Sequence, residues 1–238
     1  MQTALVTVGD ELLAGDTENT NATWLSRRLT ERGATVERVL TVPDEASVIA
    51  DAVRRYSDAF DAVVVTGGLG RTPDDVTIES VARAFDRELV ENDLARADID
   101  RTLEAIADDY PDLAVDAAAE AEIPADARPL INHGGLSPGC VVGNVYVLPG
   151  IPSEMKRMFE EVGEEFGGDV ASRLLYTEEP EANLIEHLDA VRERFGVKVG
   201  CYPDREARHN RLKLSGSDEG ALGEAERWLA ERITLLEE

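Results

Sequence analysis

The chain is poor in cysteine and has no long hydrophobic run. Cys140 and Cys201 are its only cysteines, which is too few for a disulfide framework, and neither has a partner at CxxC spacing. Both lie in apolar, strand-like stretches, so we interpret them as packing residues. No segment has the length and composition of a signal peptide or a membrane span. These absences predict a cytoplasmic protein that does not associate with membranes.

Positive charge is also scarce. The chain has 24 basic residues against 49 acidic ones, a formal net charge of −25, and Lys156, Lys198 and Lys213 are its only lysines. This composition is typical of a surface adapted to high salt, where screening removes the repulsion between carboxylates, so we infer a halophilic, haloarchaeal origin. So acidic a chain should repel nucleic acid at ordinary ionic strength, and we expect no nucleic-acid partner.

The order of the expected strands and helices predicts the fold class. With 238 residues, 43% of them hydrophobic, the chain can form one large domain and one small one. Its first part alternates between buried strand patterns and amphipathic helix patterns, which predicts an α/β domain of three αβα layers with a mainly parallel sheet. Ligands of such sheets bind outside the carboxyl ends of the strands. The expected strands are 3–8, 35–42 and 61–65, and the expected helices are 21–32 and 45–56.

Gly167 and Gly168 form the clearest linker, which divides the chain into domains 1–167 and 168–238. The first domain should also contain helices 76–85, 93–108 and 152–166 and a strand 140–148, whereas 113–122 is either helix or loop. The second domain is expected to be a small α+β unit. Its predicted order is strand 173–176, helix 181–195, strands 197–202 and 211–215, and helix 219–233.

The stretch Thr66 to Thr77, TGGLGRTPDDVT, follows a buried strand and looks like a binding site. Its glycines let the backbone turn sharply and let main-chain amides approach phosphate oxygens. Thr72 or Asp74 is expected to cap a helix that begins near Asp75. The two aspartates would repel a phosphate unless a cation lies between, so they indicate a divalent metal such as Mg²⁺. The alternative is an ordinary glycine-rich turn with an acidic first helical turn.

Acids and glycines also follow the first two strands. Asp10 and Glu11 leave the first strand and Asp44 leaves the second, so all should reach the same edge of the sheet. The candidate metal ligands are Asp44, Asp74 and Asp75, and Asp10, Glu11 and Asp74 are candidates for a second ligand or a general base. His133, a loop histidine beside glycines, is interpreted as solvent-exposed. The candidate ligand-binding residues offer free amides or polar groups at four turns and at the start of the helix 21–32: Gly9, Asp10, Glu11, Gly15, Asn21, Gly67, Gly68, Gly70, Arg71, Thr72, Ser137, Pro138, Gly139, Pro149, Gly150, Pro152, Ser153 and Glu154.

Five motifs together resemble, in order and spacing, the N-terminal domain of CinA proteins, which belongs to the wider MoaB/Mog family of molybdopterin-binding and molybdopterin-adenylylating proteins. The resemblance covers about residues 3–166. The tail is similar to the small KH-like domain that follows in CinA, with 199–203 and 211–216 as the matching parts. The motifs are GDELLAG at 9–15, TENTNA at 17–22, VPDE at 42–45, TGGLGRTPDDVT at 66–77 and LPGIPSEMKRMF at 148–159.

The resemblance implies a MoaB/Mog-type fold, a dimer or trimer of identical chains, and a nucleotide or pterin phosphate as ligand. Asp44 and Asp75 match the two acids credited with the Mog chemistry, and they are the candidate catalytic residues. Gly67, Gly68 and Gly70 match the phosphate-side loop. Two positions depart from the pattern. Leu69 stands where the Mog branch has threonine, which favours CinA, and Arg71 replaces the usual proline and either contacts a phosphate or points to solvent.

We therefore expect a metal-dependent phosphoanhydride hydrolase similar to an ADP-ribose pyrophosphatase. The alternatives are molybdopterin binding or adenylylation in molybdenum cofactor biosynthesis, and a non-catalytic binding protein. The chain stops before the C-terminal amidase domain of many CinA proteins, so deamidation of nicotinamide mononucleotide is not expected. The tail lacks a GxxG loop flanked by basic residues, which argues against RNA binding.

Overall fold

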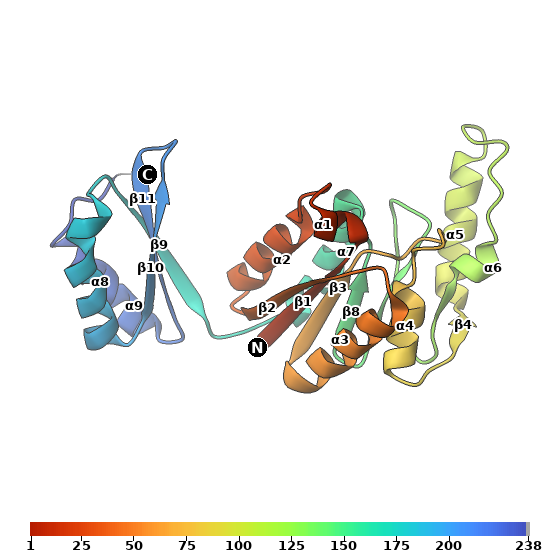
Figure 1. Cartoon of the computed structure of the whole chain (residues 1–238), viewed down its shortest axis with the longest axis horizontal. Coiled ribbons are helices and arrows are strands. Elements are labelled where there is room, and N and C mark those ends of the chain that lie inside the picture. Colours follow the sequence, from red (N-terminus) through yellow and green to blue (C-terminus); the bar gives the residue numbers. More distant parts are fainter. Residues whose placement is uncertain (237–238) are drawn as a thin grey trace. The chain divides into compact units, whose positions relative to one another are not determined.

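The computed structural model describes residues 1–236 and divides the chain into two compact units, Met1–Gly167 and Gly168–Glu238. Figure 1 shows the elements of both units in sequence colours. No helix within the described residues combines the length and the apolar composition that a membrane span requires.

Among the described residues, a six-stranded sheet forms the centre of the first unit, in the order β2-β1-β3-β8-β7-β6. Strand β1 pairs in parallel with β2 and β3, and β3 pairs in parallel with β8. Strand β7 runs opposite to the other five described strands of this sheet, so the predicted, mainly parallel sheet is confirmed. The bounds are β1 Gln2–Val8, β2 Thr35–Val42, β3 Ala62–Thr66, β6 Arg128–Leu130, β7 Gly139–Val142 and β8 Val145–Leu148.

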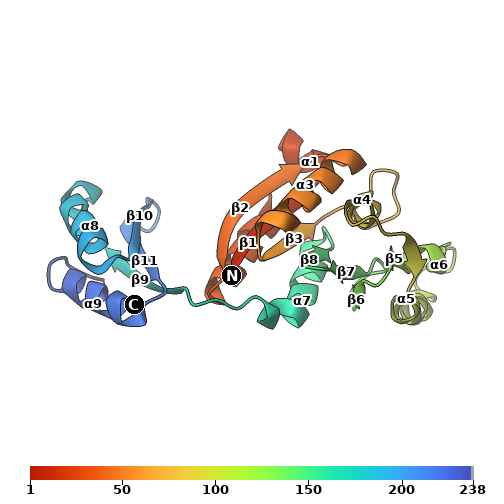
Figure 2. The ribbon, with the colours of Figure 1, turned by 90° about the horizontal axis from the view of Figure 1, so that it is seen from below.

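Helices cover both faces of this sheet, which explains the uninterrupted apolar runs of its central strands. Helices α2 (Thr20–Glu31) and α7 (Pro152–Val162) pack on one face, with Leu25, Met158 and Phe159 in the core. Helices α3 (Ala46–Ala59) and α4 (Thr77–Ala84) pack on the other face, where Ile49 and Val81 are fully buried. Figure 2 shows α3 and α7 on opposite sides of the sheet. The arrangement confirms the three αβα layers.

The residues after β1 form a short helix, α1 (Asp10–Ala14). Two local predictions were wrong. The run 140–148 forms two strands, because Gly143, with a φ of 58°, turns the chain into the β7–β8 hairpin. Helix α4 begins at Thr77 without a side-chain cap, so neither Thr72 nor Asp74 caps it.

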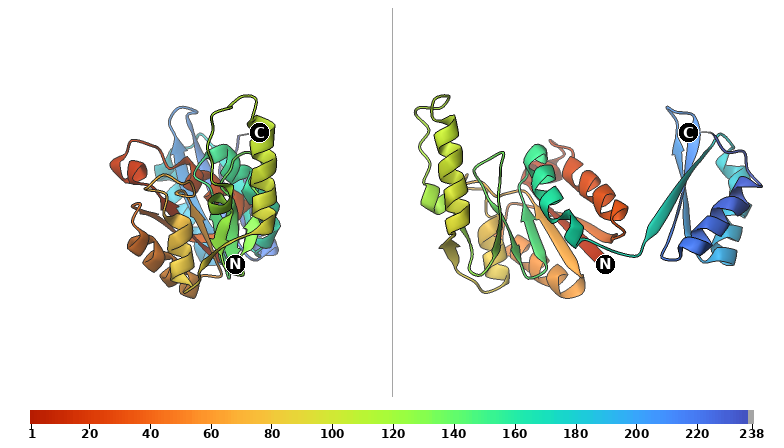
Figure 3. Two further views of the ribbon diagram at one scale, coloured as in Figure 1. Left: turned by 90° about the vertical axis from the view of Figure 1, so that its right-hand side faces the viewer. Right: turned by 180° about the vertical axis from the view of Figure 1, so that it is seen from behind.

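A smaller lobe lies between α4 and β6 in the sequence (Figure 3). Strands β4 (Leu89–Glu91) and β5 (Glu122–Pro124) pair antiparallel, and α5 (Asp93–Ile106) starts at an Asn92 cap. The segment 113–122, predicted as helix or loop, is loop followed by the single turn of α6 (Ala117–Glu120).

The second unit has an antiparallel sheet in the order β10-β11-β9, covered by α8 and α9. Leu184 and Val191 of α8 and Leu222 of α9 are fully buried against Leu212 and Leu214 of β11. The predicted small α+β unit is therefore confirmed. Its bounds are β9 Ala171–Thr177, α8 Glu181–Phe195, β10 Lys198–Asp204, β11 His209–Gly216 and α9 Glu219–Ala230.

Candidate functional site

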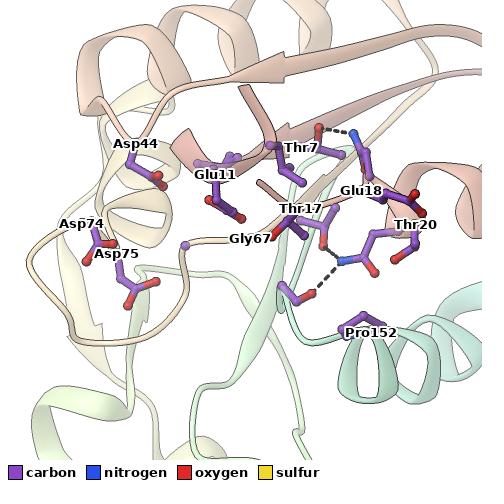
Figure 4. A pocket seen from close by; sticks show the side chains of 18 residues that line it. Thr7, Glu11, Thr17, Glu18, Thr20, Asp44, Gly67, Asp74, Asp75 and Pro152 are labelled. Atoms are coloured by element: carbon purple, nitrogen blue, oxygen red, sulfur yellow. Dashed lines mark hydrogen bonds between the residues drawn. The ribbon is translucent and has the colours of Figure 1, made fainter. Parts of the chain in front are cut away.

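A cavity of about 340 Å³, here called the strand-end pocket, lies where β1, β2, β3 and β8 end (Figure 4). Because these strands are parallel, their carboxyl ends meet at one edge of the sheet. Among the described residues, no lysine or arginine lines the pocket. Its lining is Thr7, Val8, Gly9, Glu11, Leu12, Thr17, Glu18, Asn19, Thr20, Asn21, Asp44, Thr66, Gly67, Gly68, Asp74, Asp75, Gly150 and Pro152.

Two glycines bring the backbone after β3 against β1. Gly67 and Gly68 have φ values of 108° and 64°, which side chains other than glycine rarely adopt. A Cβ on Gly67 would stand 2.3 Å from the Val8 carbonyl oxygen, and a Cβ on Gly68 would stand 2.6 Å from the Thr77 hydroxyl. The loop can therefore take this path only with glycine, and it presents bare main chain to the pocket.

Carboxylates occupy one end of the pocket, and hydrogen bonds hold two of them. The Asp10 amide donates to Asp44 Oδ2 at 2.8 Å, and the Thr72 amide donates to Asp75 Oδ2 at 3.1 Å. The Thr72 hydroxyl also donates to Asp75. Figure 4 shows Asp44, Asp74 and Asp75 at this end. The aspartates therefore come to one place from two different strand ends.

The environment of Asp44 disfavours its charge. Burial raises the pKa of its carboxyl, the Asp10 amide lowers it, and the negative charges of Asp10, Glu11 and Asp74 raise it again, with a net rise above the ordinary value. The folded protein therefore holds a proton at pH values where the unfolded chain has lost it. As the pH rises from the ordinary aspartate pKa to the raised pKa of Asp44, the charging of this carboxyl lowers the free energy of unfolding. The full loss of stability persists at neutral pH.

We expect Asp44→Asn to raise the thermal unfolding midpoint at pH 7 in EDTA and constant salt, because the amide keeps an acceptor for Asp10 without the charge. The gain should shrink as pH falls towards the ordinary aspartate range, where the wild-type carboxyl is protonated in both states. Asp51→Asn, on the exposed surface of α3, removes a charge elsewhere and serves as the control. Equal gains for the two variants at every pH would contradict the prediction.

The other end of the pocket is polar and uncharged except for Glu18. Asn21 Nδ2 donates to the Gly150 carbonyl at 2.7 Å and approaches Thr66 Oγ1 at 3.3 Å. Its Oδ1 is buried without a partner among the described residues. A buried acceptor without a donor is costly, so this atom is suited to a donor on a ligand.

A second cavity of about 80 Å³ shares Gly68 and Asp75 with the strand-end pocket. Arg71 lines it, with Nε 3.8 Å from Glu120 Oε1. Burial raises the pKa of Glu120, the Arg71 charge lowers it, and the charges of Asp75 and Asp116 raise it again, with a net rise. Arg71 thus faces an acid across the smaller cavity instead of lining the strand-end pocket.

The structure brings many of the predicted residues together. The strand-end pocket contains Gly9, Glu11, Asn21, Asp44, Gly67, Gly68, Asp74, Asp75, Gly150 and Pro152, and the smaller cavity adds Gly70, Arg71 and Pro138.

Eight predicted residues line neither cavity, and the structure gives reasons for several. Thr72 donates a hydrogen bond to Asp75, and the amide of Asp10 donates one to Asp44. Gly139 begins β7, and a Cβ on this residue would stand 2.3 Å from the Val147 carbonyl oxygen. Glu154 accepts a hydrogen bond from Asn132 at 2.7 Å. His133 is half exposed, as predicted. The residues outside both cavities are Asp10, Gly15, Thr72, Ser137, Gly139, Pro149, Ser153 and Glu154.

The polar run 17–20 was not predicted as a whole to belong to the site, although it supplies much of the uncharged end. Asn19 caps α2 through Ala22 and donates to the Thr7 hydroxyl at 2.9 Å, which ties the start of the helix to β1. The sequence feature that could have indicated this part of the site is TENTN at 17–21, a run rich in helix-capping residues directly before a helical pattern. Thr7, Leu12 and Thr66 also line the pocket, although none of them was named as a candidate residue. Leu12 and Thr66 belong to the motifs at 9–15 and 66–77, whereas the local sequence of Thr7 gave no sign of a site.

No group of three or more potential metal ligands stands ready within residues 1–236. Mg²⁺, however, is usually held by one or two carboxylates together with substrate phosphates and water. Asp44 and Asp75 offer hard oxygen ligands, and the glycine loop leaves room beside them. The donor chemistry therefore fits a divalent cation that arrives with its phosphate ligand.

The fold and the pocket define an α/β domain whose site is built on glycines and acids at the ends of parallel strands. The chain belongs to the molybdopterin-binding domain family, because residues 4–167 match the family model described as "Probable molybdopterin binding domain".

Known relatives agree with this family. A protein of Archaeoglobus fulgidus is 34% identical over 221 residues, which cover 92% of each chain. A CinA-like protein of Citrifermentans bemidjiense is 41% identical over 165 residues, or 68% of this chain and only 39% of the relative. The crystal structure of a CinA protein of unknown function from Thermoplasma acidophilum is 35% identical, with a TM-score of 0.61 over 69% of this chain and 97% of that one. The resemblance to CinA-like proteins is thus confirmed for the first unit.

The second unit requires a correction. Residues 169–235 match a family model described as "FAD synthase, middle domain". The comparison does not support the KH-like assignment, which depended on two short strand segments with little sequence character of their own.

Proposed function

We propose that the strand-end pocket binds a nucleotide or pterin phosphate and that the protein is a metal-dependent phosphoanhydride hydrolase acting on ADP-ribose-like dinucleotides. The observation that carries this proposal is the meeting of Asp44, Asp74 and Asp75 with the bare main chain of Gly67 and Gly68 in one pocket. The assembly we expect is a homo-oligomer, a dimer or a trimer.

The charge of the pocket supports a metal. A phosphoanhydride is anionic, and no basic side chain lines the pocket to neutralise it. Asp44 and Asp75 would hold Mg²⁺ or another divalent cation, with Asp74 as a further ligand. When bound, such an ion neutralises charge on the phosphates and lowers the pKa of a coordinated water.

The chain's own residues would orient the reactants. The Asp10 amide and Thr72 fix the two carboxylates, and the glycine loop lets the phosphates approach without meeting a Cβ. Glu11 lies close to Gly9, whose Cβ would stand 2.5 Å from the Glu11 carboxylate, and it is the candidate base. It would take a proton from the attacking water as the new O–P bond forms and the bridging P–O bond breaks, which releases two monophosphates.

The second candidate function is molybdopterin binding or adenylylation. Its specific support is the buried, unpartnered Oδ1 of Asn21 beside Glu18, because the edge of a pterin ring carries N–H donors. The description of the matched family model points the same way. A non-catalytic binding role uses the same contacts without the metal chemistry.

A hydrolysis screen in high salt tests the first proposal. ADP-ribose, FAD and NAD⁺ are incubated with Mg²⁺, Mn²⁺ or Co²⁺, and products are separated by chromatography. We expect turnover of at least one dinucleotide to two monophosphates, and its loss in EDTA, because the described lining of the pocket supplies no basic side chain that could replace the metal. Absence of turnover with every metal would favour the binding role, and a copurified fluorescent pterin would favour the second candidate.

A further inference from the structure

A second groove adjoins the strand-end pocket. This cavity of about 390 Å³, here called the α2 groove, is lined by residues of α2, of the segment before it and of α7. Glu18, Asn19 and Thr20 line both cavities, so the groove begins where the uncharged end of the pocket stops. The remaining lining is Thr23, Trp24, Arg27 and Lys156.

The groove contains two basic side chains without acidic partners. Arg28 of α2 and Arg32, directly after this helix, both pair with Glu160, at 2.7 and 2.9 Å. Arg27 and Lys156, by contrast, form no ion pair with any described residue. In a chain with 49 acidic and 24 basic residues, two unpaired cations in one groove leave a local positive charge, opposed within the lining only by Glu18.

Trp24 positions one of these cations. Its ring packs perpendicular to the buried ring of Phe159, with centroids 5.5 Å apart, so the core fixes the indole. Lys156 Nζ lies 5.9 Å from the centre of the Trp24 ring, within the range of a cation–π contact. The groove therefore holds the ammonium group on a rigid aromatic support.

We propose that the α2 groove binds a second anionic group of the substrate, a phosphate that lies one sugar away from the phosphoanhydride. This inference depends on the proposed function for the position of the phosphoanhydride itself. Lysine and arginine are donors only, and a phosphate offers acceptors to both. The preferred substrates are then nucleotide phosphoanhydrides that carry an extra phosphate on a ribose.

The two cavities divide the charges of such a ligand. The acidic end of the pocket accepts a phosphoanhydride only with its metal, whereas the groove accepts a phosphate directly. Between them, the Glu18 carboxylate and the Thr20 hydroxyl are placed to contact sugar hydroxyls. Arg27 and Lys156 also supply positive charge next to a pocket that otherwise repels anions.

Two matched pairs of probes test the groove: NADP⁺ against NAD⁺, and coenzyme A against dephospho-coenzyme A. Each pair differs by one ribose phosphate. Dissociation constants are measured by calorimetry with Mg²⁺ at constant salt, on the wild type and on the double variant Arg27→Gln/Lys156→Gln. We expect the wild type to bind the phosphorylated member of at least one pair about tenfold more tightly, and the double variant to lose that preference.

The control variant, Arg55→Gln/Lys198→Gln, removes the same charge from α3 and from the second unit and should keep the preference. In a Trp228→Phe background, Trp24 is the only tryptophan, and its fluorescence should respond more to the phosphorylated probe. Where a probe is hydrolysed, KM replaces the dissociation constant. Equal affinity within both pairs, or a preference that survives in the double variant, would overturn the groove assignment. Failure of hydrolysis alone would instead contradict the proposed function, since the comparison measures binding.

Discussion

Replacing Asp75 by asparagine should reduce phosphoanhydride hydrolysis by at least about a hundredfold while the protein folds as the wild type does. Asp75 lies in the wall between the strand-end pocket and the smaller cavity, so it can reach a phosphate and its metal from either side. Asparagine keeps an oxygen that can accept from Thr72, so the loop should hold its shape. What it loses is the negative charge that binds the cation.

Initial rates over a range of Mg²⁺ concentrations measure the effect, and circular dichroism and the unfolding midpoint verify the fold. Asp74→Asn is the matched control, because Asp74 lines the same pocket but accepts no hydrogen bond from the Thr72 amide. It should lose less activity than Asp75→Asn. Full activity in a folded Asp75→Asn protein would remove Asp75 from the catalytic site, and equal losses in both variants would make the two acids equivalent.

The sequence predicted the main architecture well because its central strands carry strong signals. Strand β3 is buried at all of its five positions and is followed directly by glycines, so the sequence predicted both the strand and the residue at which it ends. Helix α8 ends at Gly196, which adopts a φ of 65°, and its predicted bounds match the structure. Prediction failed at the β7–β8 hairpin because the two apolar runs, buried throughout, were interpreted as one strand. The exposed Gly143 and the polar Asn144 between them are a two-residue turn signal that this interpretation passed over.

The sequence predicted those residues of the candidate site that directly follow a strand. It did not predict the contacts that depend on which strands lie side by side in the sheet. Because β8 lies beside β3, Gly150 comes next to Gly67, where a Cβ on Gly150 would stand 3.3 Å from the Gly67 Cα. Strand β7 lies one position further out, and Ser137 and Gly139 line neither cavity, although Pro138 between them lines the smaller one. No local pattern specifies that order. The contacts of Asn21 with Gly150 and of Lys156 with Trp24 likewise join segments more than a hundred residues apart in the chain.

Replacing Gly67 by alanine should destabilise the first unit by about 2 to 5 kcal/mol, from two separate causes. The φ of 108° strains any residue with a Cβ, at about 1 to 2 kcal/mol. The new methyl group would also stand 2.3 Å from the Val8 carbonyl oxygen, so β1 or the loop must move, and such overpacking adds about 1 to 3 kcal/mol. Denaturant unfolding at constant salt, followed by Trp24 fluorescence in the Trp228→Phe background, measures the loss.

Gly15→Ala separates the two causes. Gly15 also has a positive φ, 77°, but a Cβ there would meet nothing within 4 Å. It should therefore show the backbone strain alone, about 1 to 2 kcal/mol. If Gly67→Ala costs no more than Gly15→Ala, the loop has room beside β1 and does not need glycine at that position. If Gly67→Ala costs several kcal/mol more than Gly15→Ala, the close approach of the loop to β1 is what requires glycine at this position. Any side chain at Gly67 should then reduce both stability and ligand binding.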